Sequence, residues 1–181
     1  MIFAMFKRSG NQRVIERLHG DIVAAVRQPS LYADYGVDDT FDARYEVLIL
    51  CATLLVRRLA LSPSPGPEVS QELTDRIFSE LDAAMREMGV GDLAVPKRIK
   101  KLAAAFLGRR KAYDAALSAA STEQMAASLS RNVYGLEPAE GAARAARLAR
   151  YAFAVEAAFS AAPLEIFVKG SAPFPKAEAI E

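Results

Sequence analysis

One run of ten residues, Val47 to Val56, contains no charged side chain and only one polar residue, Thr53. The run lies inside a longer segment, Phe41 to Leu61, that would be apolar on almost every side if it formed a helix. Such a helix is stable in water only when other elements surround it, so the pattern predicts the central helix of a bundle. A membrane span needs about 20 apolar residues. Because this run is shorter and charged residues border it closely, we expect a buried core helix.

Five further segments are predicted to form helices around this centre. Apolar residues recur at helical spacing over residues 11–28, 68–88, 96–117, 121–132 and 138–159. Pro96 and Pro138 stand at first helical positions, where proline is tolerated. Ser121 and Gln124 have the spacing of a capping box. Alanine is abundant and no convincing strand is found, so the fold class is predicted to be all-α.

Proline and glycine divide the remaining chain. Residues 30–40 are predicted to form a loop, and the proline-rich segment 62–67 a rigid connection between two helices. A chain of 181 residues is expected to form one domain. We place this helical domain of about six helices at residues 1–162. Residues 163–181 contain three prolines and are expected to form a partly irregular, flexible C-terminal tail.

Catalytic chemistry is not indicated. There is one cysteine, Cys51, within the apolar run, and one histidine, His19, without a second ligand nearby in sequence. Asp38, Asp39 and Asp42 form a cluster of acids, but their spacing does not match a calcium loop, and we expect them to cap the following helix. No phosphate-binding glycine loop or nucleophile elbow is present. We therefore expect no enzymatic activity, no cofactor and no metal site.

The charges of the central part of the chain are segregated, although the net charge is only +1. Residues 62–94 carry seven acids and two bases, whereas residues 96–113 carry seven bases and no acid. On a helical wheel of the second stretch, Ile99, Leu102, Phe106 and Tyr113 share one side and the lysines the opposite side. We call the following residues the basic face: Lys97, Arg98, Lys100, Lys101, Arg109 and Lys111.

The basic face has three interpretations. It is a solvated surface whose charges keep the protein soluble or pair with the preceding acidic helix, or a docking face for a polyanion such as ribosomal RNA or acidic lipid headgroups, or a surface for an acidic protein. Specific DNA binding is not supported, because no recognition-helix pattern of base-contacting side chains is present.

Apolar residues also surround the glycine-rich turn between these two helices. They are Met85, Met88, Val90, Leu93 and Val95. Methionines adapt their shape and are common on apolar binding surfaces. Either the two methionines belong to the core, as the stripe that they continue suggests, or the turn forms an apolar patch that holds a client helix.

The sequence around this turn resembles a known family. Residues 86–97 (REMGVGDLAVPK), Lys100 and Lys101, and the segments FLGR (106–109) and AYDAAL (112–117) closely resemble the signature of the ubiquinol–cytochrome c chaperones. The segments RYEVL (44–48), LLVR (54–57) and RNVYG (131–135) are similar to further motifs of the family. The resemblance extends over about residues 31–159, and the Met-Gly-Val-Gly-Asp block is unusual enough to be specific.

This resemblance implies an all-helical protein that helps to assemble the cytochrome bc1 complex. Mitochondrial relatives bind newly made cytochrome b together with a small partner protein near the ribosomal exit. Transferred to this chain, the turn and the neighbouring aromatic residues Tyr45, Phe106 and Tyr113 would face the client. The basic face would contact the ribosome or an anionic membrane surface.

The chain also departs from those relatives. It has no long amphipathic presequence, and its first six apolar residues precede Lys7 and Arg8, the reverse of a signal peptide. We therefore expect a bacterial, cytoplasmic protein that is peripheral at the inner membrane and whose small partner protein is uncertain. The leading hypothesis is a non-catalytic chaperone for cytochrome b. The alternative is a general helical module that binds ribosomes, RNA or anionic membranes without specificity for the bc1 complex.

Overall fold

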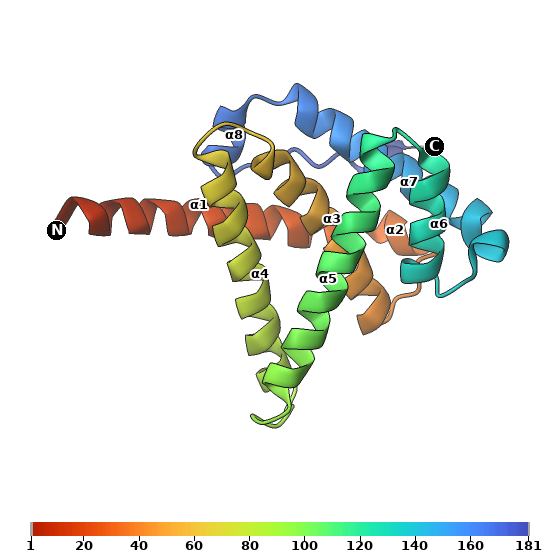
Figure 1. The fold of residues 1–181 in the computed structure, drawn as a ribbon, viewed down its shortest axis with the longest axis horizontal. Coiled ribbons are helices and arrows are strands. Elements are labelled where there is room, and N and C mark those ends of the chain that lie inside the picture. The colour runs from red at the N-terminus through yellow and green to blue at the C-terminus, as the bar shows by residue number, and fades with distance from the viewer. Residues whose placement is uncertain (1, 181) are drawn as a thin grey trace.

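The structure is a computed structural model that describes the backbone of residues 2–180 and the side chains of residues 11–180. The apolar residues 1–6 lie outside the part whose side chains are described. The helices are α1 (Ile2–Val26), α2 (Pro29–Ala33), α3 (Phe41–Ala60), α4 (Gly66–Glu87), α5 (Val95–Ser118), α6 (Thr122–Val133), α7 (Pro138–Ala161) and α8 (Leu164–Val168), followed by a 3-10 turn, η1 (Ala177–Ala179) (Figure 1). Residues 2–180 contain no strand, which confirms the predicted all-α class.

Helix α3 occupies the centre of the bundle, as its apolar sequence predicts. It packs against α1, α4, α5, α6 and α7. Side chains such as Leu50 and Leu54 are completely buried, and the thiol of Cys51 lies among them. Within the described part of the chain, none of the helices combines the length and apolar content needed to cross a membrane.

The start of α3 differs in one detail from the sequence-based prediction. Thr40, not one of the neighbouring aspartates, is the N-cap, and its hydroxyl accepts a hydrogen bond from the Ala43 amide at 3.2 Å. Asp39 instead forms an ion pair with Arg44 at 2.5 Å. Asp42 lies in the first turn, where a negative charge is favoured by the helix dipole.

The segment 30–40, which we expected to be a loop, contains the short helix α2. Pro29 ends α1 and also begins α2, because proline fits the first turn of a helix as well as it breaks the interior of one. Leu31 in α2 and Tyr35 just after it are almost completely buried. The segment is therefore part of the core, and the prediction of a plain loop was wrong.

Two close approaches of backbone to neighbouring atoms require glycine. A Cβ atom at Gly66, where α4 begins, would lie 2.5 Å from the carbonyl oxygen of Leu59. A Cβ atom at Gly141 in α7 would overlap the hydroxyl oxygen of Ser130 in α6 and lie 2.8 Å from Leu136 Cβ. The predicted cap of α6 is also present, since Ser121 Oγ accepts a hydrogen bond from the Gln124 amide at 3.2 Å. These contacts fix the α3–α4 and α6–α7 connections.

The C-terminal tail is partly irregular, as predicted, and includes α8 and η1. It packs against the same core as the other helices: Phe167 is fully buried and its ring meets that of Phe159 at a centroid distance of 5.5 Å. Ala177 is also buried. The flexibility expected for this tail stays a prediction.

Candidate functional site

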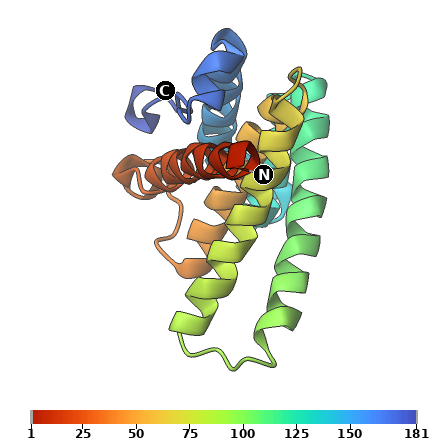
Figure 2. The same cartoon turned by 90° about the vertical axis from the view of Figure 1, so that its left-hand side faces the viewer.

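Helices α4 and α5 form a helical hairpin whose connecting loop makes up one end of the molecule (Figures 1 and 2). We call this hairpin the arm and its loop, residues 88–94, the arm tip. Helix α4 ends in a glycine turn: Gly89 has a φ of +79°, and the Val90 amide donates to the Met85 carbonyl at 3.0 Å. Arg86 pairs with Asp82 at 2.6 Å and with Asp92 at 2.5 Å, which ties the loop to the helix. The arm tip therefore has a defined conformation.

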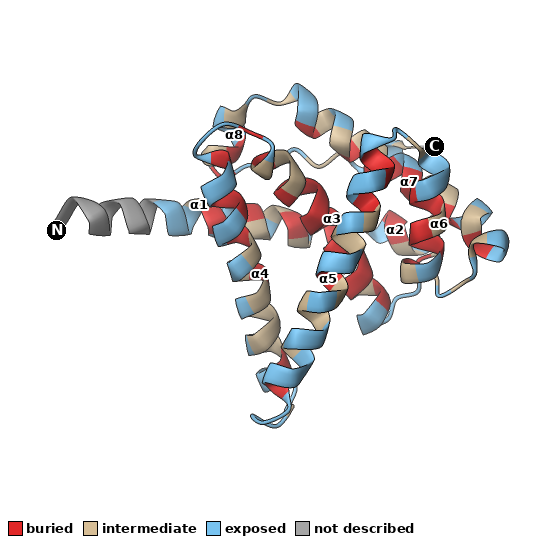
Figure 3. Ribbon diagram, viewed as in Figure 1, coloured by how far each residue is buried: buried red, intermediate tan, exposed pale blue. Residues whose placement is uncertain are grey.

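The arm tip exposes large apolar side chains. Leu93 is 97% exposed and Met88 is 56% exposed, while Val90 is half-buried. The apolar residues that flank the arm tip are buried instead. Met85 at the end of α4 is 5% exposed, and Val95 at the start of α5 is completely buried. Figure 3 shows the resulting pattern, with exposed residues over most of the arm tip. Neither Leu93 nor Met88 belongs to the buried core of the described residues.

The three aromatic residues assigned to the client surface by the resemblance lie deeper. Phe106 is buried and packs edge-on against Phe78 of α4 at a centroid distance of 5.6 Å. Tyr113 is completely buried, and its hydroxyl accepts a hydrogen bond from Asn132 at 3.3 Å. Tyr45 is buried too, but it lines a groove, and its hydroxyl donates to the Leu102 carbonyl at 3.2 Å. Among the three, Tyr45 is the one next to open space.

This groove, which we call the arm groove, lies between α3, α4 and α5 and has a volume of about 410 Å³. Phe41, Tyr45, Met85 and Leu102 supply its apolar lining, and Arg98 and Lys101 are exposed at its edge. Phe41 and Leu102 were not among the expected site residues. Phe41 is 53% exposed although it begins the most buried helix. The sequence contains one indication of this: Phe41 is a large apolar residue at the first position of α3, where the helix end is open to solvent.

The basic face is divided by the structure into two parts. Arg109 binds Glu46 of α3 through two guanidinium nitrogens, one of them 2.6 Å from a carboxylate oxygen. Burial raises the pKa of Glu46, and the hydrogen bonds from Arg109 oppose that rise. Arg109 therefore stabilises the contact between α3 and α5, whereas the remaining five residues of the basic face are exposed.

The exposed lysines do not neutralise the acidic α4. Among the described residues, no ion pair joins α5 to α4; the bases Arg76 and Arg86 of α4 pair instead with Glu80, Asp82 and Asp92. Within the same part of the chain, Lys97, Lys100 and Lys101 form no ion pair. The structure therefore does not show the basic face paired with the preceding helix, and a solvated face that keeps the protein soluble stays an interpretation of these exposed charges.

The structure also locates the single cysteine and the single histidine of the chain. Cys51 is fully buried, and burial raises the pKa of its thiol to about 12. A protonated, inaccessible thiol is a poor nucleophile. Burial lowers the pKa of His19, which lies near Arg76 and Glu80 of α4. Within residues 11–180, no group of three or more potential metal ligands is brought together.

Two comparisons with known proteins identify the same family. The family model described as ubiquinol–cytochrome C chaperone matches residues 33–174. The crystal structure of the Cbp3 homolog from Brucella abortus superposes on this fold with a TM-score of 0.87; the two chains are 34% identical, and the alignment covers 100% of each. A search of curated protein sequences gives no match. The family model covers most of the chain, and the chain belongs to the ubiquinol–cytochrome c chaperone family.

Proposed function

We propose that this chain is a non-catalytic assembly factor that binds newly made cytochrome b and supports assembly of the cytochrome bc1 complex at the cytoplasmic side of the membrane. Membership of the chaperone family supports the general role. The observation that carries the specific proposal is the pair of exposed apolar side chains, Leu93 and Met88, at the arm tip. Exposed apolar residues that gather at the end of a projecting element are typical of an interaction site.

The proposed client surface runs from the arm tip into the arm groove. Met88, Val90 and Leu93 are its accessible apolar residues, and Tyr45 and Met85 line the groove beside them. The remaining residues of the expected set, Val95, Phe106 and Tyr113, support this surface from within the core. A client helix would place its apolar side on this surface, and methionine side chains can adapt to helices of different sequence.

The physical need for such a surface follows from the nature of the client. A segment that will span a bilayer has about 20 apolar residues, and before insertion these residues are exposed to water. Temporary burial against the arm lowers the free energy of that exposed state by roughly 25 cal/mol for each Å² covered. Catalysis is not needed for this role.

The test replaces apolar side chains of the arm tip with aspartate. We expect Leu93→Asp and Met88→Asp to reduce copurification of cytochrome b at least roughly tenfold, the effect of losing a central interface residue. Leu61→Asp is the matched control, because Leu61 is 70% exposed and lies at the end of α3, outside the proposed surface. Antimycin-sensitive ubiquinol–cytochrome c reductase activity in membranes of each strain gives the functional readout.

The control and the folding state decide the outcome. Both arm-tip variants should retain the circular dichroism and unfolding midpoint of the original protein, because the replaced side chains are exposed. Normal capture of cytochrome b by the two variants, or equal loss in the Leu61→Asp control, would contradict the proposal.

A second candidate function is a general module that binds ribosomes or anionic membranes. The exposed lysines Lys97, Lys100 and Lys101 favour it, because none forms an ion pair within the described part of the chain. Phosphate contacts weaken steeply with salt, whereas apolar contacts do not. We expect the triple variant with glutamate at these three positions to lose sedimentation with ribosomes or vesicles at low salt. Glutamate at Arg13, Arg27 and Arg131, which are also exposed, provides a control with the same change in charge.

A further inference from the structure

One edge of the arm groove carries positive charge that the chain itself does not compensate. Arg98 and Lys101 of α5 are exposed at this edge. Within the described residues, neither side chain forms a hydrogen bond or an ion pair. The two positions are three residues apart, so the side chains leave the same side of the helix with their Cβ atoms about 5–6 Å apart. The groove is therefore bordered along α5 by two adjacent cations.

The polar groups on the floor of the arm groove, in contrast, are paired. The carboxylate of Glu46 accepts hydrogen bonds from two guanidinium nitrogens of Arg109. Burial raises the pKa of Tyr45 to about 12, so its hydroxyl stays protonated and donates to the Leu102 carbonyl. The side chains of Tyr45, Leu102 and Met85 then present mainly carbon atoms to the groove. The floor favours an apolar occupant, because a polar group buried there without a partner would lose its hydration.

The opposite edge of the groove carries negative charge. Asp42 of α3 is exposed and lies one turn before Glu46. Because Arg109 neutralises Glu46, the remaining charges of the groove are two cations along α5 and the carboxylate of Asp42 along α3. An occupant with acidic groups is attracted on the side that faces α5, and an occupant with basic groups in the same place is repelled there.

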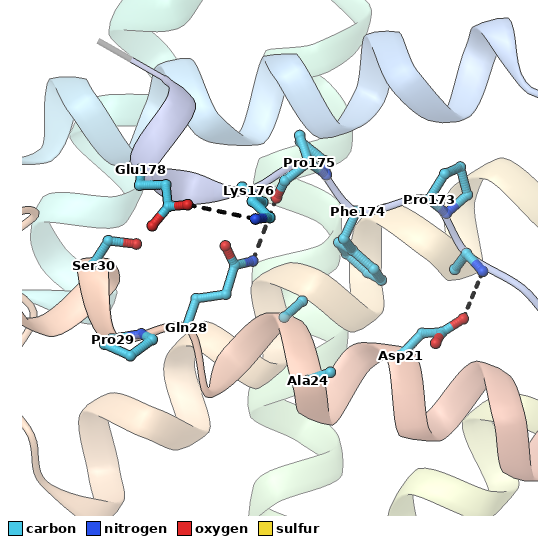
Figure 4. Close-up of a pocket in the computed structure, with 12 residues that line it drawn as sticks. Asp21, Ala24, Gln28, Pro29, Ser30, Pro173, Phe174, Pro175, Lys176 and Glu178 are labelled. Atoms are coloured by element: carbon cyan, nitrogen blue, oxygen red, sulfur yellow. Dashed lines mark hydrogen bonds and ion pairs between the residues drawn. The ribbon is translucent and has the colours of Figure 1, made fainter.

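A hollow of similar size, about 430 Å³, lies beside the C-terminal tail and differs in this respect (Figure 4). Asp21 accepts a hydrogen bond from the Ala172 amide, and Gln28 Oε1 accepts one from the backbone of η1. Lys176 Nζ lies 3.7 Å from a carboxylate oxygen of Glu178. The chain itself thus provides partners for the polar side chains of that hollow, whereas it provides none for the two cations of the arm groove.

We propose that the arm groove selects a partner helix whose apolar side is bordered by two acidic residues one turn apart, and that Arg98 and Lys101 pair with these carboxylates. This inference rests on the client surface proposed above and adds the charge pattern by which a client is chosen. Acidic residues three or four positions apart on a helix match the spacing of the two cations. A nucleic-acid backbone would satisfy the cations but would leave the apolar floor empty.

The size of the groove fits such an occupant. Its volume of about 410 Å³ is close to that of one helical turn, a cylinder about 10 Å wide and about 5.4 Å high. One turn of the partner helix would place its apolar side chains against Tyr45 and Met85. The carboxylates at the border of that side would then face α5, where exposure to solvent makes the pairing sensitive to salt.

The test uses two fluorescent helical peptides of about 18 residues and fluorescence anisotropy with the full chain. Both peptides have leucines along one side. The first carries two glutamates one turn apart beside the leucines, and the second carries lysines at the same two positions. At low salt we expect the glutamate peptide to bind at least roughly fivefold more tightly than the lysine peptide. This difference should decrease at about 0.5 M salt, while binding through the leucines remains.

Reversing the charge of the groove edge should reverse the preference. Arg98→Glu/Lys101→Glu should bind the lysine peptide at least roughly fivefold more tightly than the glutamate peptide. The matched control is Arg27→Glu/Lys111→Glu, which makes the same change in net charge at exposed positions outside the lining of the arm groove. The control should keep the preference for the glutamate peptide. All four side chains are exposed, so both variants should fold like the original protein.

The outcomes separate this proposal from the client surface on which it rests. Equal binding of the two peptides by the original protein, or a preference that the control variant also reverses, would overturn selection by charge and leave the apolar client surface intact. Absence of binding by either peptide would contradict both. Vesicles of phosphatidylglycerol test the remaining occupant: if Arg98→Glu/Lys101→Glu loses vesicle binding but binds the two peptides as the original protein does, the cations serve a membrane surface and the proposal is wrong.

Discussion

The chain contains two helical hairpins with opposite properties, α4–α5 and α6–α7. In α6–α7 the helices meet so closely that Gly141 leaves no space for a side chain, and the Ser130 hydroxyl donates to the Leu136 carbonyl of the connection at 2.9 Å. Leu148 and its apolar neighbours in α7 are fully buried. In α4–α5 the helices end at a tip where Leu93 is almost completely exposed. The same motif, a helical hairpin, is packed into the core in α6–α7 and ends in an exposed apolar tip in α4–α5.

This difference separates the proposed client surface from the part of the fold that gives stability. Substitutions in α6–α7 should act on the free energy of unfolding, because its side chains are surrounded by others. Substitutions at the arm tip should leave that free energy unchanged and act on binding. A chaperone benefits from this separation, since an apolar surface that binds clients cannot also be the surface that holds the fold together.

The largest expected difference comes from removing one leucine from each hairpin. Leu148→Ala in α7 should lower the free energy of unfolding by about 2–5 kcal/mol, since it leaves a cavity in the core. Leu93→Ala at the arm tip should change it by less than about 0.5 kcal/mol. Chemical denaturation followed by circular dichroism measures both. Equal losses would mean that the arm tip contributes to the core and would remove the contrast between the hairpins.

Much of this contrast could be predicted from the sequence, but only in its helical parts. The apolar run at 47–56 predicted a central helix, and the helical wheel of α5 separated Phe106 and Tyr113 from the lysines as the structure does. At the arm tip the residues are not helical, so periodicity carries no information there. Leu93 in the arm tip and Val95, the first residue of α5, are two positions apart and both apolar, yet Leu93 is exposed and Val95 is completely buried.

Contacts between distant segments were also beyond prediction. Glu46 lies beside the apolar run of α3, and its partner Arg109 was assigned to the basic face because both flanks of a helix look equally exposed in sequence. The arm groove depends on how α3, α4 and α5 are placed together, and no local pattern fixes that placement. The tail was correctly expected to be partly irregular, but the sequence does not show what holds it. The Ala177 amide binds Gln28, which is 149 residues away in the chain, and the Phe174 ring packs against Phe159.

The second prediction adds one methyl group to each hairpin. Gly141→Ala should destabilise the protein by about 1–3 kcal/mol, because the new Cβ would overlap Ser130 Oγ. Gly108→Ala in α5 should stabilise it by up to about 1 kcal/mol, since no atom lies within 4 Å of the new Cβ and alanine has the higher helix propensity. Thermal unfolding of the two variants should therefore shift in opposite directions. A shift in the same direction would show that one of the hairpins is packed differently in solution.

The third prediction concerns how one helix of each hairpin begins. Ser121 caps α6 with extended backbone angles, so Ser121→Ala should cost about 1 kcal/mol of stability. The N-cap of α5 is Ala94, whose backbone is helical, with φ −89° and ψ −29°. A cap side chain needs extended backbone angles to reach the helix amides. Ala94→Ser should consequently give no measurable gain, and a gain above about 0.5 kcal/mol would mean that the arm tip adopts another conformation in solution.

The smallest expected effect is a pH dependence at the base of the arm. His19 of α1 lies near Arg76 and Glu80 of α4, and burial lowers its pKa below the ordinary value of 6.5. The unfolded chain then binds more protons than the folded one, so stability falls as pH decreases through 6.5 toward the pKa of the folded state. His19→Gln should flatten this part of the stability curve between pH 7.5 and 5.5. Because His19 is the single histidine of the chain, an NMR titration assigns its pKa directly. A pKa at or above 6.5 would show that the charge of Glu80 outweighs burial at His19. Helix α1 would then hold the arm by charge attraction and not by apolar packing.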